Sequence, residues 1–178
     1  MRSLFTSFHC ATLATLLLAG VVGPAAGQAL PPSASQSVAG PSTGTLTGQS
    51  LYLPVYSHIW HGEMDKKGQP TRALMSVSVS IRNTDLSRPI RILSAQYYDT
   101  NGRKLREYVP APRNVAPMGT LEIFVPRSDD TGGSGANFVI VWKADAPVSP
   151  PMVEGVHASL QAGRSVAFVT SARPMSAD

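Results

Sequence analysis

Alternation of apolar and polar residues dominates the chain after about the first fifty positions. Residues 75–82 are the clearest case, because Met75, Val77, Val79 and Ile81 alternate with polar side chains. A period of two is typical of a strand with one buried and one solvated face. This segment is therefore predicted to be a strand that covers a hydrophobic core.

Seven further segments alternate in the same way or contain a short apolar run. Gly, Pro, Asn and Asp residues typical of turns separate them. These predicted strands are 51–57, 90–99, 104–109, 120–126, 137–143, 153–160 and 165–170. Because no helical period intervenes, the pattern favours an all-β, immunoglobulin-like antiparallel β-sandwich of about seven to eight strands. A small β-barrel is the alternative.

The inward-facing positions of these strands predict the core. The predicted core residues are Val77, Val79, Ile81, Ile92, Leu121, Ile123, Phe138, Ile140, Trp142, Val156 and Phe168. Tyr97 and Tyr98 are neighbours on one strand, so they must face opposite sides of the sheet. One is expected to be a core residue or a hydroxyl anchor, and the other to be exposed.

The N-terminus has a different pattern. Arg2 precedes an apolar stretch at about residues 11–22, which Pro24 and small residues follow. This order is typical of a secretory signal peptide, and a helix of about twelve apolar residues reaches only about 18 Å of a roughly 30 Å hydrocarbon core. We therefore expect residues 1–27 to be a cleaved export signal. The mature chain is expected to be periplasmic or extracellular, with no transmembrane segment.

The next segment, residues 28–49, has no charged or aromatic side chain and is rich in Pro, Ser, Gly and Thr. Such a composition cannot bury enough apolar surface to offset the entropy of ordering. A disordered tether is predicted here. The β-sandwich domain is predicted at residues 50–172 and a disordered tail at residues 173–178.

Charge and cysteine content narrow the function classes. The formal net charge is +4 and the basic residues are scattered, which does not suggest a nucleic-acid-binding surface. The single cysteine, Cys10, lies within the predicted signal, so the mature chain is expected to lack disulfides, thiolate metal sites and Cys nucleophiles. An unknown protein or an anionic envelope glycan is the expected partner, and the pattern does not indicate an oligomeric state.

Four segments together resemble a known family. They are residues 52–59 (YLPVYSHI), 80–85 (SIRNTD), 97–102 (YYDTNG) and 132–138 (GGSGANF). In this order they resemble an uncharacterised family of exported bacterial proteins that is known only as a domain of unknown function. The resemblance implies a small exported bacterial domain, and it implies no activity and no ligand.

Two segments concentrate polar and aromatic residues that strand packing does not require. One lies at residues 56–61 and the other at residues 129–137. If both lie at one end of the sandwich, they are expected to form its ligand-binding rim. The candidate ligand-binding residues are Tyr56, His58, Trp60, His61, Asp129, Asp130, Gly132, Gly133, Ser134 and Asn137.

A metal-binding protein or metal-dependent enzyme is the first alternative. His58 and His61 with a carboxylate such as Asp129 have the donor types that hold Zn²⁺, and Asp130 or His157 are further possible ligands. However, residues three apart on a strand point to opposite faces. The sequence therefore favours a binding rim without a metal or other cofactor.

No catalytic motif is found. Ser134 lacks the nucleophile-elbow pattern, because position 136 is Ala and a strand follows rather than a helix. A carboxylate pair for glycoside hydrolysis would have to come from glutamates without a characteristic spacing. These are Glu63, Glu107, Glu122 and Glu154. The chain is therefore predicted to be a non-catalytic binding module, with a cell-envelope structural or assembly component that offers a sheet edge as a further alternative.

Overall fold

The computed structural model describes residues 44–176. The predicted export signal and most of the predicted tether lie outside these residues. Within them the chain forms twelve strands and no helix, and every strand pair is antiparallel. The predicted all-β antiparallel class is confirmed. None of the described residues belongs to an apolar helix of membrane-spanning length.

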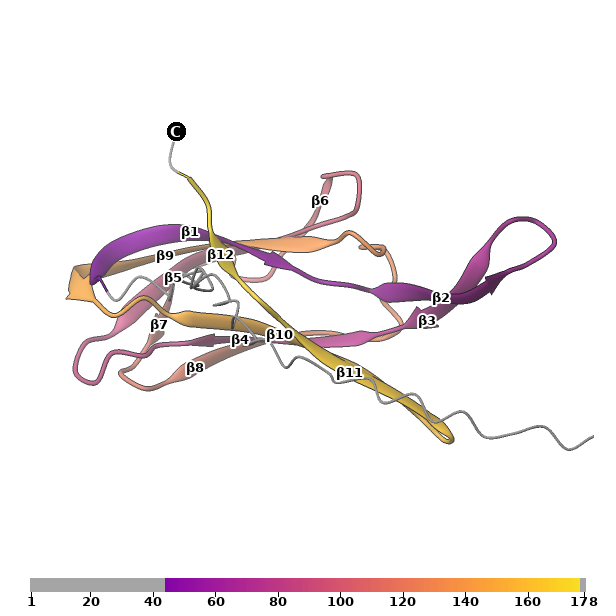
Figure 1. The fold of residues 1–178 in the computed structure, drawn as a ribbon. Coiled ribbons are helices and arrows are strands. Elements are labelled where there is room, and N and C mark those ends of the chain that lie inside the picture. The colour runs from indigo at the N-terminus through magenta and orange to yellow at the C-terminus, as the bar shows by residue number, and fades with distance from the viewer. Residues whose placement is uncertain (1–43, 177–178) are drawn as a thin grey trace, which may run out of the picture. The chain divides into compact units, whose positions relative to one another are not determined.

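Two sheets and one separate hairpin make up the fold (Figure 1). The first sheet contains β1 (Leu46–Pro54), β5 (Ile90–Tyr98), β6 (Lys104–Glu107), β7 (Arg113–Val115), β9 (Asn137–Val148) and β12 (Arg173–Pro174). Its order is β12-β1-β9-β5-β6, and β7 also pairs with β5. The second sheet contains β4 (Ser76–Arg82), β8 (Thr120–Val125), β10 (Met152–Gln161) and β11 (Arg164–Ser171), in the order β11-β10-β4-β8. The separate hairpin consists of β2 (His58–Met64) and β3 (Pro70–Leu74).

The hydrophobic core lies between the two sheets. Leu53, Phe138 and Trp142 enter it from the first sheet and are fully buried. Val79 and Ile81 enter it from the second sheet and are also fully buried. The predicted sandwich is therefore confirmed, and the alternative of a closed barrel is not, because the two sheets have separate strand orders.

One predicted core residue is wrong. Val156 is 39% exposed, because the positions of β10 that face the core are occupied by Val153, Gly155 and His157. The alternation of the strand therefore turns Val156 to the outer face. Phe168 is only half-buried.

The structured segment extends beyond the predicted bounds at both ends. β1 begins at Leu46 rather than at residue 50, because Leu46 and Gly48 pair with β9. β12 places Pro174 opposite Leu51, so the predicted tail begins with a short strand. Pairing with distant strands orders these residues, and their own composition does not predict it.

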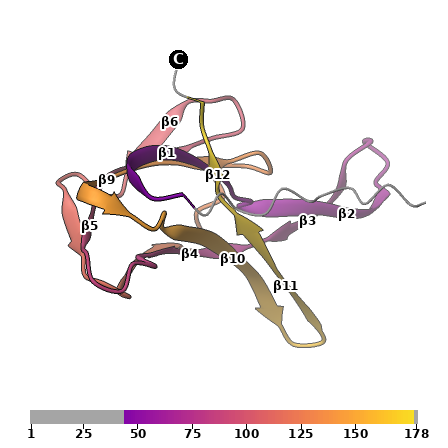
Figure 2. The same cartoon turned by 60° about the vertical axis from the view of Figure 1, so that its left-hand side comes forward.

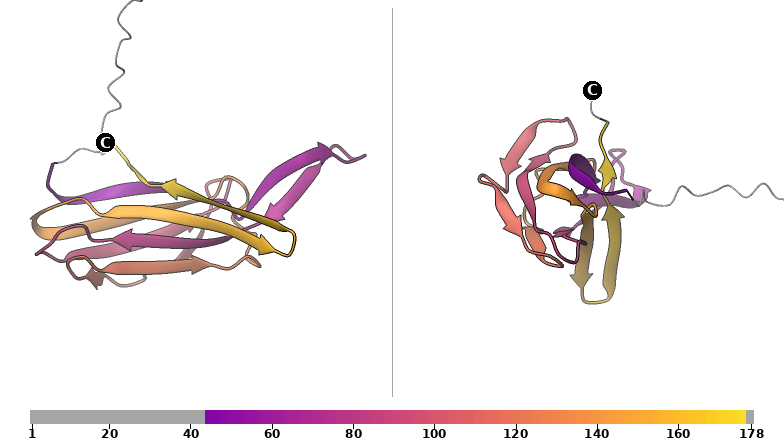
Figure 3. Two further views of the ribbon diagram at one scale, coloured as in Figure 1. Left: turned by 60° about the horizontal axis from the view of Figure 1, so that its bottom comes forward. Right: turned by 90° about the vertical axis from the view of Figure 1, so that its left-hand side faces the viewer.

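Two hairpins extend from the same end of the sandwich (Figures 2 and 3). One is β2–β3, which connects β1 of the first sheet with β4 of the second. The other is the tip of β10–β11, where the turn between Gln161 and Arg164 contains Gly163 with a φ of 78°. A depression lies between these hairpins.

Candidate functional site

The structure brings the two predicted rim segments together at this end of the sandwich. The second segment, residues 129–137, consists of most of the β8–β9 loop and Asn137, the first residue of β9. The Ser57 N–H donates to the Gly133 carbonyl at 3.0 Å. Arg72 on β3 forms an ion pair with Asp130 at 3.0 Å. The β8–β9 loop therefore contacts the base of the β2–β3 hairpin and supports it.

Tyr97 anchors this base from the core. Its hydroxyl lies 2.8 Å from the Ser57 hydroxyl, and its ring stacks on Phe138 at 5.0 Å. Burial raises the pKa of the Tyr97 hydroxyl. A Cβ at Gly132 would overlap this hydroxyl, so the close approach requires glycine. Tyr97 is the predicted hydroxyl anchor, and Tyr98 is half-buried rather than fully exposed.

Several polar groups of the β8–β9 loop have partners within the protein. Asp129 accepts a hydrogen bond from the Thr131 hydroxyl at 2.6 Å and lies 3.9 Å from Arg106. The Gly135 N–H donates to the Thr100 hydroxyl at 2.9 Å. These groups already have partners, so a ligand would have to compete for them. Its contacts hold β9 against β5 and the start of β2.

The two remaining candidates of this loop have no chemical partner that indicates catalysis. Ser134 is half-buried, and its side chain makes no hydrogen bond with a histidine in residues 44–176. Asn137 opens β9, where it lies opposite Pro54 and Tyr98. Neither residue contributes a polar side chain to the depression between the hairpins.

His58 and His61 lie on opposite faces of β2. His58 is buried against Trp60, with ring centroids 4.8 Å apart, and neither ring nitrogen has a hydrogen-bond partner in the described residues. Burial and then the nearby Arg72 lower the pKa of His58. His61 is exposed and lies opposite Thr71. Across residues 44–176, no three His, Cys, Asp or Glu side chains come together as a metal site requires.

His157 has a packing role on β10. Its Nε2 atom accepts the Tyr56 N–H at 3.1 Å, and its ring stacks on Phe168 at 4.5 Å. Burial lowers the pKa of His157, so the neutral ring is favoured at pH 7. Tyr56 packs edge-on against both rings, so it is part of this cluster rather than an exposed rim residue. Trp60 remains exposed.

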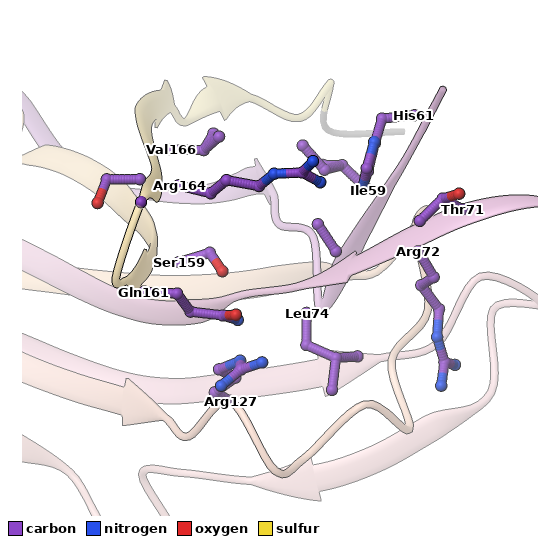
Figure 4. A pocket seen from close by; sticks show the side chains of 13 residues that line it. Ile59, His61, Thr71, Arg72, Leu74, Arg127, Ser159, Gln161, Arg164 and Val166 are labelled. Carbon is purple, nitrogen blue, oxygen red and sulfur yellow. The ribbon is translucent and has the colours of Figure 1, made fainter. Parts of the chain in front are cut away.

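A groove lies between β2–β3 and the tip of β10–β11, with a cavity volume of about 850 Å³. Ile59, Leu74 and Val166 form its apolar walls. Figure 4 shows the Arg164 side chain extending across the groove toward Ile59. Arg127, which follows β8, lies on the other side near Leu74 (Figure 4).

The groove is positively charged. Among the described residues, three arginines line it and no Asp or Glu does. Arg72 is neutralised by Asp130, which lies outside the lining. Arg127 and Arg164 form no ion pair with any other residue of the described range. Two exposed guanidinium groups therefore lie beside an apolar surface, and residues 44–176 supply no counterion for either.

Sequence analysis did not find Arg127 and Arg164. The available signal is their position next to turns. Arg127 follows the end of β8 after Pro126, and Arg164 is the first residue of β11 after the hairpin turn. β8 and β10 both pair antiparallel to β4, so they run in the same direction and finish at the same end of the sheet. This strand order, which the sequence pattern does not contain, is what brings the two arginines together.

The fold and the groove define a small antiparallel β-sandwich with a ligand-sized depression at one end. The chain belongs to the family described as Protein of unknown function (DUF3124), whose model matches residues 48–175. This match confirms the resemblance to a domain of unknown function. No curated protein matches the chain.

One similar solved structure is described as "Crystal Structure of Thermotoga maritima 1070". It is 9% identical, and the match covers 70% of this chain and 92% of that chain with a TM-score of 0.39.

Proposed function

We propose that this chain is an exported, non-catalytic binding module that holds an anionic ligand with an apolar part in the groove between β2–β3 and β10–β11. The observation that carries the proposal is the presence of Arg127 and Arg164, both without an ion-pair partner in the described residues, in a groove that no carboxylate lines. The proposed ligand carries a phosphate or carboxylate group, as anionic envelope glycans and acidic protein segments do.

Physical chemistry supports this class of ligand. Guanidinium groups bind carboxylates and phosphates through paired, charge-assisted hydrogen bonds. The cavity volume of about 850 Å³ lies in the range of small-molecule sites, roughly 300–1,000 Å³. Ile59, Leu74 and Val166 would cover the apolar part of the ligand. An anion with an adjoining apolar group therefore matches both kinds of lining.

A binding role is favoured over catalysis by the composition of the groove. Its other polar side chains include His61, Ser159 and Ser165. Within the described residues, no hydrogen bond joins His61 to either serine, as the contact between a nucleophile and its base would. These side chains can instead orient a ligand that the arginines attract.

The test compares two probes with the same alkyl chain and opposite charge. Octyl phosphate is expected to bind in isothermal titration, and octylammonium is not. Arg164→Glu and Arg127→Glu should each weaken octyl phosphate binding by about tenfold or more, because each replaces an attraction with a repulsion. Inorganic phosphate should bind more weakly than octyl phosphate because it lacks the apolar part.

Arg113→Glu is the matched control. Arg113 is an exposed arginine on β7, outside the groove, and the same charge change there should leave binding unchanged within about twofold. Equal losses in all three variants would show a general charge effect and reject the groove as the site. Equal binding of octylammonium would reject an anionic ligand.

Export is tested separately. The composition of residues 1–27 supports it, with cleavage after Gly27 or Ala29. Expression of the full chain in a Gram-negative host should give periplasmic protein whose intact mass corresponds to one of these new N-termini. Uncut protein in the cytoplasmic fraction would contradict export and would leave the groove proposal to its own test.

A further inference from the structure

β11 is an open edge of the second sheet. It pairs with β10 along its whole length, and no strand in the described residues pairs with its other side. Its eight residues pair without a register shift. The edge is therefore long and regular.

The direction of the free backbone groups follows from one hydrogen bond. The Ala172 N–H donates to the Val153 carbonyl at 2.9 Å, and these two residues continue the β10–β11 register. In an antiparallel pair, hydrogen-bonded and non-hydrogen-bonded pairs alternate along the strand. The residues of β11 whose N–H and C=O groups point away from β10 are therefore Ser165, Ala167, Val169 and Ser171.

This edge lacks the usual protection against strand addition. Proteins block exposed edges with lysines, prolines, bulges or short strands. Residues 165–171 contain no charge and no proline. By contrast, the β2–β3 hairpin has a register shift after His61 and carries Lys66 and Lys67 at its tip, and β8 is followed directly by Pro126. Of these edges, β11 is the least protected.

An apolar surface accompanies the open edge. Val169 is 55% exposed and lies opposite Val156, which is 39% exposed, on the outer face of the second sheet. Ala167 and Ala158 form the next pair on the same face. An added strand would therefore gain main-chain hydrogen bonds and would extend an apolar strip at the same time.

We infer that β11 pairs with β11 of a second copy of this chain, antiparallel and about a two-fold axis at Phe168. This register places Ser165 opposite Ser171 of the partner subunit and Ala167 opposite Val169 of the partner subunit. All the outward-pointing backbone groups then form hydrogen bonds, about eight in total, and the two four-stranded sheets become one continuous sheet.

A second copy fits this edge because the edge is complementary to itself. The paired positions are serine with serine and alanine with valine, so no like charges meet. Arg164 is the only charged residue of β11, and it lies opposite Ala172 of the partner subunit in this register.

The experiment measures self-association of the protein as purified after expression of the full chain. Sedimentation velocity from about 1 to about 500 µM should show a concentration-dependent dimer. Val169→Lys, which adds a charge at the centre of the pairing, and Ala167→Pro, which removes an outward N–H, should each weaken dimerisation by about tenfold or more. Circular dichroism should show that both variants remain folded, since neither change removes a bond to β10.

Phe124→Lys is the matched control. Phe124 is 58% exposed on the same face of the sheet, but it lies on β8, the edge strand opposite β11, and the variant should dimerise like the wild type. Hydrogen exchange supplies a direct signal, because the Ala167 and Val169 amides should become protected as concentration rises. A chain that stays monomeric at about 500 µM, or a dimer that survives both β11 variants or is lost in Phe124→Lys, would overturn the inference.

Discussion

Two polar regions at the same end of the sandwich differ in where their charges are neutralised. In the β8–β9 loop, Asp129 lies 3.9 Å from Arg106, and Asp130 pairs with Arg72 at 3.0 Å. In the groove, Arg127 and Arg164 have no ion-pair partner within the described residues. The loop contains more of the predicted ligand-binding residues, but the arginines without an ion-pair partner in the described residues lie in the groove.

The difference shows that polar residues outside the strands need not serve a ligand. A glycine-rich loop with two aspartates resembles a binding loop in sequence, but here its groups hold β2, β5 and β9 together. Groups that already have partners gain little from a ligand, whereas unpaired guanidinium groups gain charge-assisted hydrogen bonds.

Gly132→Ala should be the most damaging of these changes. The added Cβ overlaps the Tyr97 hydroxyl and lies 2.8 Å from the Ala136 Cβ, so the base of the hairpin must move. We expect the free energy of unfolding to fall by about 2–4 kcal/mol in urea denaturation. Gly44→Ala is the control, because no atom lies within 4 Å of its added Cβ. Similar losses in both variants would show that the Tyr97 contact does not determine the result.

Tyr97→Phe should cost less than this. It removes the hydroxyl contact at 2.8 Å and leaves the buried Ser57 hydroxyl without its partner. The free energy of unfolding should fall by about 1–2 kcal/mol. Tyr98→Phe removes the half-buried hydroxyl that donates to Gln96 and should cost less than about 0.5 kcal/mol. An unchanged stability of Tyr97→Phe would show that this hydroxyl is not an anchor.

Acidification should destabilise the protein through its buried histidines. Burial lowers the pKa of His157 and His58 in the folded state, so the unfolded chain takes up protons more readily below about pH 6.5. Stability is therefore complete above this pH and decreases as the pH falls toward 5. Protonation of Nε2 would also remove the acceptor for the Tyr56 N–H. The difference in melting temperature between the wild type and His157→Gln should be smaller at pH 5 than at pH 7.5. An equal difference at both pH values would contradict the role of His157 in this loss of stability.

Asp130→Asn should have the smallest effect on stability and a specific effect on the groove. Both partners of the Arg72–Asp130 pair are exposed by 40% or more, so the loss of the pair should cost less than about 1 kcal/mol. The freed Arg72 should increase octyl phosphate affinity by about two- to fivefold in the same titration. Asp145→Asn releases Arg91 away from the groove and serves as the control. An equal gain in both variants would indicate a general charge effect.

The success and failure of the sequence analysis have the same physical cause. Val77, Val79 and Ile81 are buried as predicted, because alternation is a local property of an extended chain. The prediction that Val156 is buried was wrong because the core-facing positions of β10 are Gly155 and His157, which a hydrophobicity pattern ranks below valine. The β2–β3 hairpin was missed because it lies mostly outside the core and shows little alternation.

The two segments that the sequence singled out lie together at one end of the sandwich. Residues 56–61 and the β8–β9 loop contain the contacts that support the hairpin, but the sequence could not show that their polar groups bind one another. The groove itself depends on Arg127 and Arg164, which are 37 positions apart in the numbered chain and meet only through the strand order. No local sequence pattern predicts which strands finish at the same end of a sheet.

By itself, the sequence determined which side chains of a strand share a face, because the pleat of an extended backbone assigns alternate residues to opposite faces. It also determined the all-β class, because turn residues divide the chain into short alternating segments. Only the tertiary structure decided which charges are paired, which arginines share the groove and which strand edge remains open. These properties depend on how distant strands pair, and burial of the whole core selects that pairing.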